Sequence, residues 1–325
     1  MPVSLLLTGP DLRRKPPISC CLNTRVPVPA ARLRCLLRRK STRLMRISAT
    51  STWPHGTVYM IQQAAIAIDV QAEACRVCGA TNRPVFQQQV IGHSVRYFDC
   101  AECGYVQTEQ PHWLDQAYSR AINDVDTGIM ARNDLNVKRV LMTLLAMGQL
   151  GGRVIDHAGG YGILVRMLRD KGVDARWRDK YCENVVARGF EASDDRCELL
   201  TAFEVLEHMV NPLEEIAKML EAGPTVLIST ELVTSSSTPQ PDWWYYGPEH
   251  GQHIGFFRPA TLEWIAAKLG CYQASDGVSL HLFSKSPVPA RWLALVKLKR
   301  FASLAARFAP ASKTMSDFQL LRKAQ

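Results

Sequence analysis

Four groups of residues in this sequence have the types and the spacing that chemistry requires. A glycine-rich turn at residues 158–162 follows the β-branched run 153–155 and Asp156. Two Cys-x-x-Cys-Gly pairs lie upstream of it, and the segments 204–208 and 243–253, rich in acids, histidines and aromatics, lie downstream. These groups suit nucleotide binding, metal binding and proton transfer, so the elements that carry them decide what the chain can do.

The turn at 158–162 joins a predicted buried strand to a predicted helix, whose apolar positions 163, 164, 167 and 168 share one face. Strand, small-residue turn and helix open a nucleotide-binding βα unit, because glycine lets the backbone approach a ligand closely. A dinucleotide fingerprint needs a third glycine, and Val165 stands in its place, which weakens a nicotinamide-dependent oxidoreductase. A tight turn without a ligand is the other interpretation.

A second predicted strand, 173–179, ends at Asp179, which comes 23 positions after Asp156. Nucleotide-binding α/β folds place at this point the acid that accepts hydrogen bonds from the ribose hydroxyls. We therefore expect Asp179 to bind a ribose, with a solvated acid at a strand end as the alternative.

The cysteines form two pairs on glycine-containing turns, Cys75 with Cys78 and Cys100 with Cys103, and they resemble a zinc ribbon. Four thiolates complete a tetrahedral zinc shell, so the metal is expected to be structural and not catalytic. Unmetallated or redox-active cysteines are the alternative. The short runs 84–86 and 95–98 between the pairs predict strands.

Two downstream segments carry acids and histidines after predicted strands. The strand at 197–203 runs into Glu204, Glu207 and His208, and His208 has either a ligand-lining or a purely structural role. After the strand 225–230 the periodicity lapses for nearly thirty residues, which is typical of a functional loop. Within that loop, Glu249, His250 and His253 suggest acceptor binding or base chemistry, whereas a lid packed by its own aromatic side chains is the simpler interpretation.

Two of these motifs resemble those of class I S-adenosylmethionine-dependent methyltransferases. They are D-x-A-x-G-x-G at 156–162, with Ala158 in place of the usual first glycine, and E-V-L-E-H followed by V-N-P at 204–212. The resemblance implies a Rossmann-like, mostly parallel sheet and S-adenosyl-L-methionine as cofactor. The donor-site residues that it implies are Asp156, Ala158, Gly159, Gly160, Gly162, Asp179, Glu204, Glu207 and His208.

With the zinc knuckles and the Y-G-P-E-H-G-Q-H loop, the order of motifs resembles a branch of these enzymes that carries an N-terminal zinc-binding domain. That branch includes C-methyltransferases of nucleotide-linked deoxysugars. The resemblance implies a small-molecule acceptor that is methylated at carbon or at oxygen. It points to His250 as the base, with Glu249 and Tyr246 as helpers. A hydroxyl acceptor would equally use His250 or His253.

The fold class is therefore α/β, with helices expected at 133–150, 212–220 and 258–269. The segments 271–274 and 278–284, joined by Ser-Asp-Gly, predict a terminal antiparallel hairpin. The expected domains are a basic extension (1–60), a zinc-binding domain (70–112), a methyltransferase domain (130–285) and a basic C-terminal helix and tail (286–325).

The charge of the chain lies mainly in its two ends. Residues 1–60 hold eleven basic side chains and one acid, residues 286–325 hold eight and one, and the segment 61–285 consequently carries a net charge of −8. A negative body disfavours a nucleic-acid-binding or RNA-modifying zinc-ribbon protein. That class and a catalytically silent adenosylmethionine-binding module are the competing hypotheses.

Three interpretations compete for residues 1–60: a targeting peptide, a disordered basic arm, or sequence upstream of a true start at Met60. At the other end, residues 289–310 predict a basic amphipathic helix, which either packs on the domain or lies on a membrane surface. No apolar run reaches the ~18 residues of a membrane span, and the cysteine pattern favours a reducing, cytoplasmic setting; the oligomeric state stays open.

Overall fold

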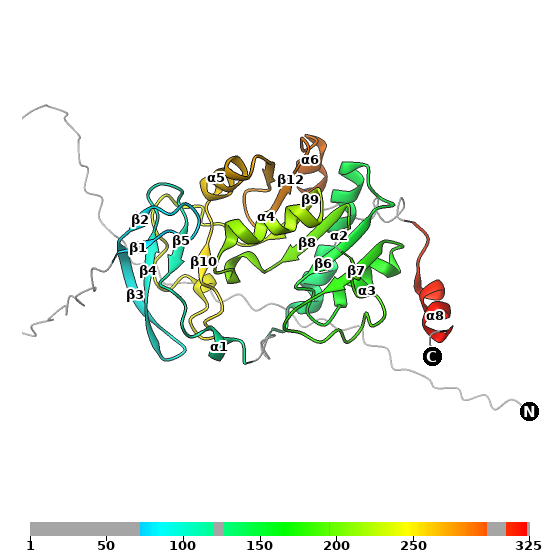
Figure 1. Cartoon of the computed structure of the whole chain (residues 1–325), viewed down its shortest axis with the longest axis horizontal. Helices are drawn as coiled ribbons and strands as arrows, with labels where there is room; N and C mark the ends of the chain where they lie inside the picture. Colours follow the sequence, from blue (N-terminus) through cyan, green and yellow to red (C-terminus); the bar gives the residue numbers. More distant parts are fainter. Residues whose placement is uncertain (1–71, 120–125, 195, 298–309, 324–325) are drawn as a thin grey trace, which may run out of the picture. The chain divides into compact units, whose positions relative to one another are not determined.

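Six strands form the main sheet, in the order β11-β12-β9-β8-β6-β7 (Figure 1). The computed structural model describes residues 72–119, 126–194, 196–297 and 310–323. The parallel strands are β6 (Arg153–His157), β7 (Asp174–Arg178), β8 (Leu199–Phe203) and β9 (Thr225–Ser229). The strand β12 (Leu280–Ser284) runs antiparallel to β9, and β11 (Tyr272–Ser275) runs antiparallel to β12. The predicted mostly parallel sheet with a terminal hairpin is confirmed.

Helices cover both faces of this sheet because consecutive strand residues are apolar. In β6, Val154 packs with α2 (Ile129–Met147), α3 (Ile163–Asp170) and α6 (Arg291–Lys297). Its neighbour Ile155 packs into a different cluster, which contains residues of α4 (Pro212–Ala222) and α5 (Pro259–Leu269). Side chains alternate between the faces of a strand, so a continuous apolar run requires cover on both sides. The α/β class is thus confirmed.

The helix expected at 133–150 begins earlier and ends earlier than the sequence pattern indicated. In the structure, α2 ends at Met147 because Gly148 takes a left-handed conformation, with φ of +74°. Glycine reaches this conformation without a Cβ clash and closes helices in this way. The Gly151-Gly152 pair, which we expected to end the helix, therefore lies in the loop beyond it.

A second, four-stranded sheet contains the cysteine-rich segment and has the order β10-β5-β4-β3. Its strands are β3 (Pro84–Val90), β4 (His93–Asp99), β5 (Val106–Thr108) and β10 (Gly255–Phe256), while β1 (Glu73–Ala74) pairs with β2 (Thr81–Asn82). All four strands are antiparallel to their neighbours. The helix α1 (Leu114–Ala117) follows β5. The strand β10 directly follows residues 243–253, which we call the aromatic loop. Its pairing with β5 therefore ties the aromatic loop to the segment that carries the four cysteines (Figure 1).

The first part of the basic tail is a packed helix. Trp292 of α6 is fully buried and its indole N–H donates to Thr143 Oγ1 across 3.1 Å. Arg291 donates to the carbonyl of Ala146 in α2. Between these residues and the last helix, α8 (Thr314–Lys323), residues 298–309 lie outside the described residues, as do the predictions for residues 1–60. Among the described helices, none is both long and apolar enough to cross a membrane.

Candidate functional site

The carboxyl end of β6 places Asp156 under the glycine-rich turn. Its side chain is buried and its Oδ1 accepts a hydrogen bond from Thr201 Oγ1 of β8 across 2.7 Å. Burial raises the pKa of Asp156 to about 7, because the charged carboxylate loses its hydration. The hydrogen bond between Thr201 and Asp156 therefore joins the end of β6, which leads into the glycine-rich turn, to β8.

The turn itself presents bare backbone. Ala158 and Gly160 both have positive φ, +55° and +52°, and a Cβ on Gly159 would lie 2.9 Å from the Asp156 carboxylate and from Trp177 Cδ1. The position that departs from the usual glycine, Ala158, thus holds a left-handed conformation that alanine adopts only at a cost. Strained positions of this kind cluster at binding sites.

Asp179 follows β7 and binds the turn directly. Its Oδ2 accepts a hydrogen bond from the Gly160 amide at 2.9 Å, and its Oδ1 accepts from the amides of Tyr181 and Cys182 at 2.7 and 2.8 Å. Trp177 donates its indole N–H to the Gly160 carbonyl across 2.9 Å. The glycine-rich turn and the end of β7 therefore form one hydrogen-bonded unit.

The segment after β8 brings two acids and a histidine to the same end of the sheet. Glu204 has a φ of +56°, and Ser229 at the end of β9 donates to its Oε1 across 2.5 Å. Glu207 and His208 lie in the short helix η1 (Leu206–His208). Glu207 is fully buried beside the hydroxyls of Tyr245 and Thr230, but neither carboxyl oxygen makes a well-formed hydrogen bond to a described residue. Burial, which is the larger effect, and the nearby Glu204 raise the pKa of Glu207 to about 8.

The aromatic loop supplies two further imidazoles. His253 donates its Nδ1 proton to the Tyr245 carbonyl across 2.6 Å, so its Nε2 carries the lone pair in the neutral ring. His250 has the opposite arrangement, because its Nδ1 accepts from the Gln252 amide and the neutral ring must then carry its proton on Nε2. Burial lowers the pKa of both, that of His253 to about 4, so both rings are neutral at pH 7.

A cavity of about 990 Å³ joins these parts at the carboxyl ends of the parallel strands. Asp156, Ala158, Gly159, Gly160, Asp179, Glu204, His208, His250 and His253 line it. Of the other predicted site residues, Gly162, Glu207, Tyr246 and Glu249 are not among the described residues that line it. Tyr246 is buried in the aromatic cluster of the loop and donates its hydroxyl to the Pro239 carbonyl.

Several lining residues were not anticipated from the sequence. Tyr118 lies 2.9 Å from His208 Nδ1 and stacks on Tyr181, with 5.6 Å between the ring centroids. From α2, Arg132 and Asn136 reach the cavity. No motif marks these positions; only the place of Tyr181, two residues after the predicted ribose-binding acid Asp179, offered a signal.

The chain matches one protein family, described as "Methyltransferase domain", over residues 130–275. That range contains the glycine-rich turn, Asp179, the segment 204–208 and the two histidines of the loop. Residues 130–275 of the chain are therefore similar to a methyltransferase domain. No curated protein matches the sequence.

Solved methyltransferases resemble the chain distantly. The magnesium protoporphyrin IX methyltransferase of Synechocystis, with bound SAH, is 16% identical, covers 53% of this chain and 94% of its own, and has a TM-score of 0.36. The 1,6-didemethyltoxoflavin-N1-methyltransferase of Burkholderia thailandensis is 13% identical, covers 61% of this chain and 97% of its own, and has a TM-score of 0.38. An O-methyltransferase family 2 protein of Planctomyces limnophilus, in complex with apigenin, is 17% identical, covers 52% of this chain and 63% of its own, and has a TM-score of 0.36.

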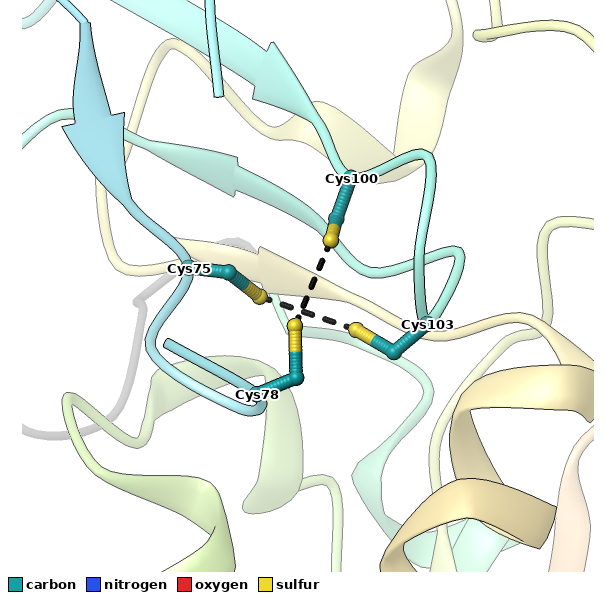
Figure 2. Close-up of side chains that lie close together, drawn as sticks. All are labelled: Cys75, Cys78, Cys100 and Cys103. Atoms are coloured by element: carbon teal, nitrogen blue, oxygen red, sulfur yellow. Dashed lines mark hydrogen bonds between the residues drawn. The ribbon is translucent and has the colours of Figure 1, made fainter. Parts of the chain in front are cut away.

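Outside the matched range of the methyltransferase domain, the four cysteines converge on one point (Figure 2). Cys75 Sγ lies 3.6 Å from Cys103 Sγ, Cys78 Sγ lies 3.5 Å from Cys100 Sγ, and all four sulfurs lie within 4.8 Å of one another. Four thiolates at Zn–S bonds of about 2.3 Å would be separated by about 3.8 Å in a tetrahedron. The cluster therefore has the dimensions that a metal ion requires.

The cysteine-rich segment also braces the loop of the methyltransferase domain. Besides the β5–β10 pairing, Trp113 donates its indole N–H to the Gly251 carbonyl across 2.8 Å, and the Ile91 amide donates to the Pro248 carbonyl. These bonds fix the backbone on both sides of His250. The position of the imidazoles thus depends on a segment more than a hundred residues earlier in the chain.

Proposed function

We propose that this protein transfers the methyl group of S-adenosyl-L-methionine to a small-molecule acceptor. The observation that carries the proposal is one cavity that has the glycine-rich turn on one side and two neutral imidazoles on the other. Its volume lies at the upper end of the range for ligand pockets, roughly 300–1,000 Å³, which leaves room for a donor and an acceptor together. The match to the methyltransferase domain supports the same assignment.

The donor end has a structure that fits adenosylmethionine. The bare backbone at Gly159 and Gly160 admits the methionine part, since a Cβ on Gly159 would clash with the site's own side chains. Asp179 lines the cavity and keeps a lone pair on Oδ2 beyond its bond to Gly160, so it accepts a ribose hydroxyl. The bound donor supplies an activated methyl group; the protein positions it and excludes water.

The acceptor end combines a proton donor with a lone pair. In the neutral state, His253 has its lone pair on Nε2, and His250 carries its proton on Nε2, the edge of the ring that lies beside Gly247. A proton donor and a lone pair together suit an acceptor that bears a carbonyl beside its nucleophilic atom. We accordingly place the lone pair that acts on the acceptor at His253, and we assign His250 to hydrogen-bond donation. Tyr246 and Glu249 do not line the cavity, and we assign them to holding the loop that carries the two histidines.

A nucleotide-linked sugar is the acceptor class that we propose, and it rests on the resemblance of the motif order to sugar C-methyltransferases. We also propose that the four cysteines bind a structural zinc ion, which the sulfur–sulfur distances support. In that arrangement the zinc holds the segment that braces the loop, far from any role in the reaction. Cys75, Cys78, Cys100 and Cys103 then contribute to catalysis only by fixing the loop backbone.

Calorimetric titration of the zinc-loaded full chain with S-adenosyl-L-methionine, with NAD as the control ligand, tests the donor. We expect micromolar binding of adenosylmethionine alone; binding of NAD alone, or of neither ligand, contradicts the proposal. Incubation with methyl-labelled donor and keto-sugar nucleotides then tests the acceptor class. Labelled product identifies the methylated atom, and label transfer only to unrelated small molecules rejects the sugar while keeping the methyltransferase.

A further inference from the structure

The carboxyl of Glu207 is buried among polar groups of the cavity wall. Glu207 is fully buried, and the hydroxyls of Tyr245 and Thr230 lie beside its carboxyl, although neither oxygen makes a well-formed hydrogen bond to a described residue. A buried carboxyl without well-formed hydrogen bonds lowers the stability of the fold by several kcal/mol, about as much as the loss of a hydrogen bond to a charged group. Buried carboxyls are therefore usually paired with another group or bound to a metal ion. The Tyr245 and Thr230 hydroxyls satisfy this carboxyl only weakly, so its oxygens remain available to a ligand.

Two imidazoles meet the same point. One ligand atom each from Glu207, His208 and His253 lie within 4.8 Å of one another. Two ligands on one ion are separated by at most about 4.4 Å, twice a bond of about 2.2 Å, so small side-chain rotations close this set. The His208 and His253 rings lie 4.9 Å apart, almost perpendicular to each other.

Neighbouring groups orient both rings as metal-binding histidines are usually oriented. His253 gives its Nδ1 proton to the Tyr245 carbonyl, which leaves the Nε2 lone pair for a ligand bond. His208 Nδ1 is hydrogen-bonded to the Tyr118 hydroxyl at 2.9 Å. A second carboxylate, Glu204, lines the same cavity and adds negative charge beside it. The arrangement favours a cation over a water molecule.

From these contacts we propose that Glu207, His208 and His253 bind a divalent first-row transition-metal ion, separate from the four-cysteine cluster. Two imidazoles and one carboxylate suit Mn²⁺, Fe²⁺ or Zn²⁺, and three protein ligands leave coordination positions open. Because His208 and His253 line the cavity, those positions face the acceptor, and an acceptor oxygen is the ligand that fits there. This inference rests on the proposed function and replaces one assignment in it: with the ion bound, the His253 lone pair binds the metal, and His253 is no longer the base.

Titration of the full chain that holds a single zinc equivalent, which the four thiolates take, with Mn²⁺ tests this site without any substrate; the electron paramagnetic resonance signal reports free Mn²⁺. Mn²⁺ disfavours thiolate ligands, so the four-cysteine cluster does not interfere. We expect one bound Mn²⁺ per chain, and at least tenfold weaker binding in Glu207→Gln and in His253→Asn. His250→Asn is the matched control, since its ring lies 4.7 Å from that of His253 but outside the ligand set; its Mn²⁺ affinity is expected to be unchanged.

The outcomes separate this inference from the proposed function. Absence of Mn²⁺ binding, or equal binding by Glu207→Gln that keeps the wild-type melting temperature, overturns the metal site. Equal loss in His250→Asn also overturns this ligand assignment. Adenosylmethionine binding is measured on the same samples before Mn²⁺ is added: donor binding without Mn²⁺ binding rejects only the inference, and Mn²⁺ binding without donor binding rejects only the methyltransferase proposal.

Discussion

Arg258 and Asp99 form a two-pronged ion pair between the start of α5 and the end of β4. Arg258 Nη1 lies 2.7 Å from Asp99 Oδ1, and Nη2 lies 2.8 Å from Oδ2. Arg258 also donates to the carbonyls of Gly104 and Ser235. One guanidinium thus joins the second cysteine knuckle, the aromatic loop and the first turn of α5.

We expect Asp99→Asn to destabilise the protein by about 3 kcal/mol, because it leaves a largely buried guanidinium without its counter-ion. The side chains of Arg258 and Asp99 are only 10% and 18% exposed, so water compensates little for the lost charge. Urea denaturation measures the change. Lys218→Met is the control, since its pairs with Glu214 and Glu215 are exposed to water and contribute little to stability. Similar losses in both variants would reject a special role for the Arg258–Asp99 pair.

Removal of the cluster metal should loosen more than the cysteine-rich segment. Cys75, Cys100 and Cys103 belong to the same buried cluster as Phe257 and Leu262 of the methyltransferase domain. If removal of the metal lowers the free energy of unfolding by about 4 kcal/mol, the melting temperature falls by roughly 8–16 °C. We therefore expect a chelator, or Cys78→Ser, to release one zinc per chain and to lower the melting temperature by that amount.

Cys271→Ser is the matched control for the metal, because Cys271 is a half-buried free cysteine outside the cluster. Its zinc content, measured by elemental analysis, should equal that of the wild type. A protein purified without zinc, or a melting profile that the chelator leaves unchanged, would count against a structural metal.

Asp179→Ala should weaken adenosylmethionine binding at least tenfold, since it removes the proposed ribose acceptor and the bond to the Gly160 amide. Calorimetry measures the affinity, and thermal denaturation verifies that the variant is folded. Glu183→Ala serves as the control: its carboxyl is 74% exposed and pairs with Arg188 away from the cavity. An affinity unchanged by Asp179→Ala would remove Asp179 from the donor site.

The attachment of α8 should depend on pH. Burial pushes the pKa of Asp317 upward, but the ion pairs with Arg169 and Arg166, at 2.7 and 2.9 Å, hold it below its usual value. A carboxyl whose pKa is lower in the folded state stabilises the fold above its unfolded pKa of about 3.9, and this contribution disappears as the pH falls through the folded pKa.

We accordingly expect Asp317→Asn to be less stable than the wild type by about 2–4 kcal/mol at pH 7, with a gap that closes below about pH 4. Comparison of the two free energies of unfolding across pH cancels the other carboxyls. A gap of constant size down to pH 3 would show that the carboxylate charge contributes nothing to the attachment.

The sequence alone determined the elements with a strong local signal. Short β-branched runs such as 225–229 predicted buried strands, and the two Cys-x-x-Cys-Gly pairs predicted their own turns. The terminal hairpin and the cysteine cluster followed from these local patterns, and the mostly parallel sheet followed from the resemblance of the motifs to methyltransferases. The loop glycines and Asp179 were anticipated in the same way, because the order of strand, turn and helix fixes which end of the sheet they occupy.

Only the tertiary structure decided the acceptor side of the cavity. The lone pair of His253 depends on a hydrogen bond to the Tyr245 carbonyl, and Tyr118 reaches His208 from ninety positions away. The two-residue strand β10 has no periodicity to read, yet its pairing with β5 places the loop. Such features arise from contacts between segments distant in the chain, and a local pattern of residues contains no information about which distant backbone will meet it.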